Sequence, residues 1–183
     1  MSVITRSWLS FAAIGAGVIH LALVISSPLA IGIPLVLFGL AELAWGVLIL
    51  VKDRVIVPRI AQAGAVAPLL LWSLLTVTAT LLAVPQINSS LRFVPMGIAA
   101  LFELFISGML SINVRRQSVV GSVAPAAPPA SALKYLCAVI LAGIIVGGLT
   151  TPALAATQAG SVAKEHGGTM GGMMNMNMTG MRH

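Results

Sequence analysis

The chain is poor in charged residues, in acids and in cysteine, and each shortage excludes a class of protein. Charged residues make up 8% of the sequence, whereas soluble domains carry about 25%, and the mean hydropathy is +1.06. A single cysteine, Cys137, excludes a disulfide within the chain. The net charge of +6 is spread over loops without a basic stripe, so we expect no nucleic-acid partner. The composition predicts a polytopic membrane protein in contact with the lipid bilayer.

Five apolar runs are long enough to cross a bilayer, which requires about 20 residues. These runs lie at about 7–27, 31–51, 62–84, 93–112 and 133–151. The sequence therefore predicts an all-α membrane helical bundle with five spans. Its predicted parts are a four-span body at 1–116, a Pro/Ala linker at 117–132, a fifth span at 133–152 and a tail at 153–183.

Most basic residues fall on one side of these predicted spans, and Lys and Arg favour cytoplasmic loops. One side carries Arg6, Lys52, Arg54, Arg59, Arg115, Arg116 and Lys134. The other side has only Arg92 before the tail. In a bacterial cytoplasmic membrane, this asymmetry predicts a cytoplasmic N-terminus and an extracytoplasmic C-terminus.

A shift of 61 residues aligns the two halves of the predicted body. The scarce residues that it superposes are Pro34 with Pro95, Glu42 with Glu103, and Arg54 with Arg115. Each unit contains two spans, so the repeat is parallel in the membrane. We therefore expect two helical hairpins, at about 7–54 and 68–115, related by a pseudo-two-fold axis along the membrane normal.

Two glutamates lie within these spans. A rise of 1.5 Å per residue puts Glu42 and Glu103 near the bilayer midplane. A carboxylate there costs ~3 kcal/mol or more, so it usually faces a bundle interior or a polar cavity. Two carboxylates that face each other would share a proton, which suits proton relay or cation coordination. The alternative is that both are protonated and only hold helices together.

His20 lies within about one helical turn of Glu42 in depth. We expect a neutral imidazole that is hydrogen-bonded to this glutamate, and a metal or quinone contact is the alternative. The sequence offers no nucleophile–base pair and no phosphate loop, so we do not expect an enzyme.

Methionine is concentrated at the C-terminus, on a Gly/Asn backbone that cannot form a core. Thioethers are soft ligands that select Cu(I). The candidate ligands are Met170, Met173, Met174, Met176, Met178 and Met181, with His166 and His183 as additional imidazoles. We expect this tail to be disordered without a ligand and to bind copper. Compositional drift and another metal are the alternatives.

The fifth span carries two further signals. Gly143 and Gly147 form a GxxxG pair, which would allow close packing between two copies of the chain. The residues Ala153-Leu-Ala155 after the span mimic a signal-peptidase site. Cleavage after Ala155 is therefore an alternative to a plain fifth span.

The segments Gly17–Ala22 (GVIHLA) and Phe38–Trp45 (FGLAELAW) resemble a group of small bacterial membrane proteins, common in actinobacteria, that have no assigned activity. In that group Ile-His-x-Ala in the first span precedes Leu-Ala-Trp in the second. The exit of the last span, Pro152–Thr157, is also similar. Many members have a second histidine soon after the first, whereas Ser, Ser and Pro fill residues 26–28 here. The tail resembles extracytoplasmic copper-handling proteins in composition.

These features together predict copper capture, delivery or resistance at the outer face, with a copper-handling membrane or extracytoplasmic protein as partner. Two alternatives stay open. One is a small transporter that couples to protons or cations through Glu42 and Glu103. The other is an accessory subunit of a larger membrane complex.

Overall fold

The computed structural model describes residues 1–52, 54–83, 91–120 and 131–172, and within them it contains helices and no strand. The helices are α1 (Val3–Val24), α2 (Leu29–Lys52), α3 (Pro58–Leu81), α5 (Phe93–Val120), α6 (Ala132–Ala155) and α7 (Gln158–Gly172). All but α7 contain a stretch long and apolar enough to cross a membrane, which confirms the five-span all-α prediction.

Helix boundaries differ from the predicted ones where caps and prolines set them. The Ser2 hydroxyl accepts a hydrogen bond from the Thr5 amide, so α1 begins before its apolar run. Pro58 occupies the first turn of α3, where its missing N–H has no cost. Helix α5 continues to Val120 and α6 begins at Ala132, and most of the linker predicted at 117–132, residues 121–130, lies outside the described chain.

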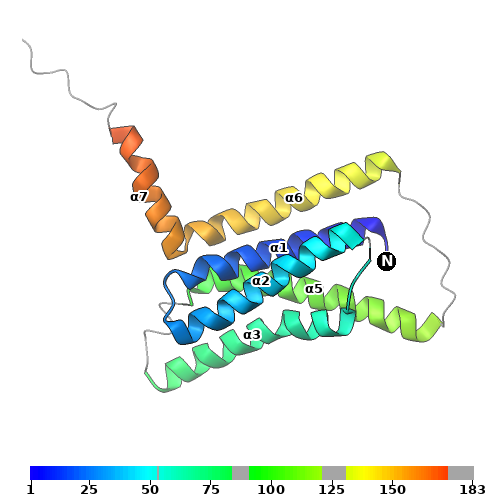
Figure 1. Cartoon of the computed structure of the whole chain (residues 1–183), viewed down its shortest axis with the longest axis horizontal. Coiled ribbons are helices and arrows are strands. Elements are labelled where there is room, and N and C mark those ends of the chain that lie inside the picture. Colours follow the sequence, from blue (N-terminus) through cyan, green and yellow to red (C-terminus); the bar gives the residue numbers. More distant parts are fainter. Residues whose placement is uncertain (53, 84–90, 121–130, 173–183) are drawn as a thin grey trace, which may run out of the picture.

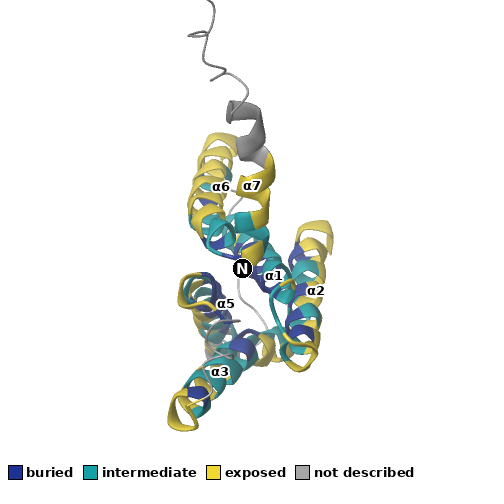
Figure 2. Ribbon diagram, turned by 90° about the vertical axis from the view of Figure 1, so that its left-hand side faces the viewer, coloured by how far each residue is buried: buried dark blue, intermediate teal, exposed yellow. Residues whose placement is uncertain are grey.

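Helix α1 lies at the centre of the bundle and contacts α2, α5 and α6, while α3 packs mainly against α5 (Figures 1 and 2). Its central position follows from its small and apolar side chains. Leu9, Ala13, Ala16, Ile19 and Leu23 are all fully buried. By contrast, α2, α3 and α6 expose apolar side chains outward, as expected for helices that face lipid.

Close packing of α1 on α2 depends on glycines. A Cβ on Gly17 would lie 2.7 Å from the carbonyl oxygen of Gly39, and a Cβ on Gly39 would lie 2.9 Å from that of Gly17. Further along the pair, the Ser10 hydroxyl donates a hydrogen bond to the Gly46 carbonyl. Small residues at such contacts let two backbones approach, which is the usual way that membrane helices associate.

The surface of α6 away from α1 has no covering element among the described residues. A Cβ on Gly143 or Gly147 would meet nothing within 4 Å, so the predicted contact between two copies stays a prediction. Cys137 on the same helix is exposed.

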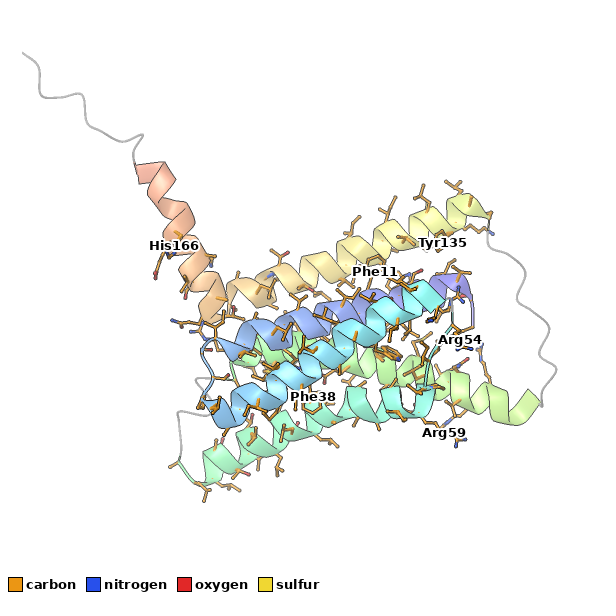
Figure 3. The ribbon with its side chains drawn as sticks, viewed as in Figure 1. Phe11, Phe38, Arg54, Arg59, Tyr135 and His166 are labelled. Carbon is orange, nitrogen blue, oxygen red and sulfur yellow. The ribbon has the colours of Figure 1, made fainter. Side chains whose placement is uncertain are left out.

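The two ends of the bundle differ in charge. Arg54 and Arg59 lie at the end where the chain begins, and α7 leaves the opposite end (Figures 1 and 3). At that opposite end the Arg92 guanidinium donates to the carbonyl oxygen of Ala156 at 2.7 Å and to Gln158 Oε1 at 3.4 Å. Arg54 and Arg59 therefore lie at the end of the bundle opposite Arg92, and the orientation of the chain in the membrane stays a prediction.

The start of the tail is a helix, not the disordered segment that the sequence predicted. Helix α7 begins after Thr157, whose hydroxyl accepts a hydrogen bond from the Gly160 amide at 3.2 Å. This cap provides a hydrogen-bond acceptor for one of the free amides of the first turn and so stabilises the helix. The prediction of disorder rested on the lack of apolar periodicity and did not consider this cap. Residues 173–183 lie outside the described chain.

Candidate functional site

Three helices bring His20, Glu42 and Glu103 together in the interior of the bundle. His20 Nδ1 of α1 lies 2.8 Å from Glu42 Oε2 of α2, and His20 Nε2 lies 3.3 Å from Glu103 Oε1 of α5. The imidazole is fully buried, and the side chains of Glu103 and Glu42 are 1% and 12% exposed. We call these three residues the histidine–glutamate cluster.

The local sequence explains why the cluster forms. Gly17 and Gly39 each precede a cluster residue by about one helical turn, so the backbone contact between them lies directly beside His20 and Glu42. On the other side, α5 approaches α1 at Gly15, where an added Cβ would lie 2.9 Å from the Phe102 ring. Phe102 is adjacent in sequence to Glu103. Glycines on α1 therefore set the spacing of both glutamates from the imidazole.

Hydrogen bonding in the cluster is incomplete. His20 Nδ1 and Glu42 Oε2 are hydrogen-bonded, whereas the contact of Nε2 with Glu103 is close enough for an electrostatic interaction but is not aligned as a hydrogen bond. Glu42 Oε1 and Glu103 Oε2 are buried and have no partner among the described residues. The cluster therefore has spare positions for a proton.

The arrangement suits a proton better than a metal ion. One atom from each residue can be chosen so that all three lie within 4.8 Å of one another, which is compatible with a shared cation. However, the two shortest contacts use different ring nitrogens, and a single ion binds only one of them. An ion on Nε2 and Glu103 has two protein ligands as long as Glu42 keeps its 2.8 Å contact with Nδ1, and recruiting Glu42 as the third ligand would break that contact.

Cavities approach the cluster from both ends of the bundle. One of about 370 Å³ includes His20 in its wall and extends towards Pro28 and Leu91, at the end where α7 departs. Another of about 200 Å³ includes Glu42 and extends towards Val57 and Ile60, at the opposite end. Phe38, labelled in Figure 3, contributes to both walls and lies 6.5 Å from the imidazole between ring centroids. The His20 imidazole thus borders the larger cavity, and the Glu42 carboxyl group borders the smaller one.

The structure does not bring the tail residues to the cluster within the described chain. His166 is exposed on α7, with its Nδ1 2.9 Å from the Val162 carbonyl oxygen (Figure 3). Met170 is on α7, but its side chain lies outside the described part. The remaining candidate copper ligands also lie outside it, namely Met173, Met174, Met176, Met178, Met181 and His183.

Sequence reasoning linked His20 to Glu42 but missed its contact with Glu103. It also missed Phe38 and Trp72, which line the larger cavity. A signal for the cluster was present, because a glycine stands three residues before both His20 and Glu42.

The chain was compared with known proteins by sequence and by structure. No protein-family model matches it, and no curated protein or solved structure matches it. The resemblance to small actinobacterial membrane proteins therefore stays a prediction.

Proposed function

We propose that the helical body is a small proton-coupled transporter in which His20, Glu42 and Glu103 bind and relay the coupling proton. The observation that supports this most is that both nitrogens of one buried imidazole face carboxylates from different helices. Ionisable residues inside membrane bundles usually belong to ion pathways, and chains of Asp, Glu and His form proton relays in pumps and transporters.

The imidazole is suited to this role because it accepts a proton on one nitrogen and releases another from the opposite nitrogen. In the proposed relay, Glu42 exchanges protons with the cavity that it lines and passes them to His20, while Glu103 stabilises the protonated imidazole through its 3.3 Å contact with Nε2. The larger cavity, which borders His20, serves the other side. A structural hydrogen-bond network would need neither spare oxygens nor two cavities, and this favours transport over helix cohesion.

The first test measures proton movement in liposomes that contain the full chain, an entrapped pH-sensitive dye and a potassium diffusion potential. We expect protein-dependent proton uptake that Glu103→Gln lowers about tenfold or more, because a neutral amide cannot stabilise the protonated imidazole beside it. Glu165→Gln is the matched control, since Glu165 is an exposed acid on α7. Protein-dependent uptake that is present and equal in Glu103→Gln and the parent would rule out the relay.

A second measurement covers a transporter that moves protons only with its cargo. Infrared spectra of the reconstituted protein should show a protonated carboxylic acid band that changes with bulk pH and is weakened in Glu42→Gln and Glu103→Gln. A band that ignores bulk pH, together with no proton uptake, would mean that the cluster is structural.

We also propose that the tail binds Cu(I), as a second and independent function. It is supported by six thioethers within residues 170–181, a density that the rest of the chain does not approach. Copper capture or delivery at the outer face would need the tail alone, so deleting residues 161–183 should abolish copper binding and leave proton uptake intact. Loss of both would contradict their independence.

A further inference from the structure

The larger cavity contains a hydrogen-bond donor that the proposed relay does not use. Trp72 of α3 lines this cavity, and its indole Nε1 is buried without a hydrogen-bond partner among the described residues. Its ring packs against Phe93 with 5.8 Å between centroids, which restrains the indole. Buried indole N–H groups usually have a partner, so this one calls for an acceptor.

The rest of the wall indicates what kind of molecule would bring that acceptor. Apart from His20 and Trp72, every residue that lines the cavity is apolar and belongs to α2, α3, α5 or, for Pro28 and Leu91, to the residues just before α2 and α5. Its volume of about 370 Å³ falls within the range of small-molecule sites, which are mostly apolar with a few placed polar groups. A strongly hydrated or charged solute would lose its water here without replacement.

The route into the cavity is also apolar. The cavity lies between α2 and α3, which barely contact each other. Leu37 of α2 and Leu70 and Leu74 of α3 do not line the cavity and are each more than half exposed, so lipid surrounds both of the helices between which the cavity lies. A molecule that reaches the cavity between these helices would therefore come from the lipid.

We propose that this cavity binds a small, largely apolar molecule with a carbonyl-type oxygen, which enters from the bilayer between α2 and α3. The oxygen accepts a hydrogen bond from Trp72 Nε1, and the apolar body packs on Phe38 and Leu75. His20 then lies in the wall of the same cavity, so the bound molecule and the proton site adjoin. The inference rests on the proposed function in one respect, that this molecule is the transported cargo.

Photolabelling tests the site on the full chain in lipid nanodiscs. The probe is benzophenone, an apolar ketone that inserts into nearby C–H bonds on irradiation, and mass spectrometry locates the label. The competitors are menthone and p-menthane, which share a carbon skeleton and differ by the carbonyl. We expect label on cavity residues such as Leu71, Leu75 and Met96. Menthone should compete at about five- to tenfold lower concentration, the effect of one hydrogen bond.

Two results would overturn the inference: label spread evenly over lipid-facing positions, or equal competition by menthone and p-menthane. Trp72→Phe keeps an aromatic ring and removes the N–H, so the advantage of menthone should disappear while labelling persists. Trp8→Phe is the matched control, because Trp8 packs on Phe105 and does not line the cavity. The two competitors already test the unmodified chain, so the outcome does not depend on the folding of a variant.

The site and the proton relay fail in different ways. Localised, menthone-sensitive labelling with neither proton uptake nor a pH-dependent carboxylic acid band would support the ligand site and remove the proposed coupling. Proton movement without localised labelling would do the reverse. Glu103→Gln should lower proton uptake about tenfold or more and retain the label, because Glu103 does not line the cavity.

Discussion

The helical body and the C-terminal region use their polar residues in opposite ways. In the body, His20 and Glu103 are almost completely buried, and backbone contacts between helices set their positions. In α7, Lys164, Glu165 and His166 are all exposed. The chemistry of the body therefore depends on where a few residues are held, so that single substitutions should matter. The chemistry proposed for the tail depends on how many thioethers it contains, so that its response should be graded.

The largest effect that we expect comes from removing the centre of the cluster. His20→Leu would leave two buried carboxyl groups without the base between them. Loss of one partner of a buried ionic group costs about 3 kcal/mol or more, to be measured as the free energy of unfolding in detergent by circular dichroism. His166→Leu should change it by less than about 0.5 kcal/mol, because this residue is exposed.

A combined variant separates the cost of unpaired buried carboxyl groups from the cost of altered packing. His20→Leu with Glu42→Leu and Glu103→Leu should recover most of the stability, since apolar replacements of a whole buried ionic group are often neutral. A triple variant less stable than His20→Leu alone would show that the carboxyl groups are not the source of the penalty.

A smaller effect should follow from a methyl group at the α1–α2 contact. Gly17→Ala would place its Cβ 2.7 Å from the Gly39 carbonyl oxygen, and overpacking of this kind costs about 1–3 kcal/mol. Gly143→Ala is the matched control in a lipid-facing helix, where the added methyl meets nothing within 4 Å. It should be neutral or slightly stabilising, because alanine favours a helix over glycine. Equal losses from both would mean that the helices do not approach closely at Gly17.

The Cu(I) affinity of the tail should depend on the number of its methionines. A synthetic 161–183 peptide with Met173, Met174, Met176 and Met178 replaced by Leu should bind Cu(I) at least about tenfold more weakly than the parent, or about 1.4 kcal/mol. Competition with a chelator of known affinity measures this. Thioethers do not titrate, so affinity should stay constant from neutral to mildly acidic pH, whereas imidazole ligands would lose affinity as pH falls through about 6.5. Undiminished binding by the Leu peptide would refute the copper proposal.

The smallest effect concerns the link between the two regions. Arg92→Gln would remove the contacts with the Ala156 carbonyl and Gln158, and an exposed interaction of this kind is worth about 1 kcal/mol or less. Hydrogen exchange at the Gly160 amide should become faster, while stability of the body is unchanged. Arg116→Gln, an exposed substitution on α5, should leave that amide unaffected.

The repeat shows how far sequence symmetry extends into structure. Glu42 and Glu103 are superposed by the 61-residue shift, and both reach the cluster. The same shift superposes His20, which is fully buried, on Leu81, which is 79% exposed. Helix α1 is central and α3 is peripheral, so their environments are not equivalent. Apolar residues that suit lipid and core equally cannot reveal this difference in advance.

The amino-acid sequence by itself determined the five apolar helices, and it predicts the depth of the two glutamates. Apolar length decides the spans because a bilayer leaves no alternative to internally hydrogen-bonded helices, and depth follows from counting residues along a helix of fixed rise. Only the tertiary structure decided that one imidazole lies between both carboxyl groups and that cavities border it on two sides. Those facts depend on how far each helix is rotated about its axis and how closely glycines let the backbones approach, and neither quantity is specified by position along the chain.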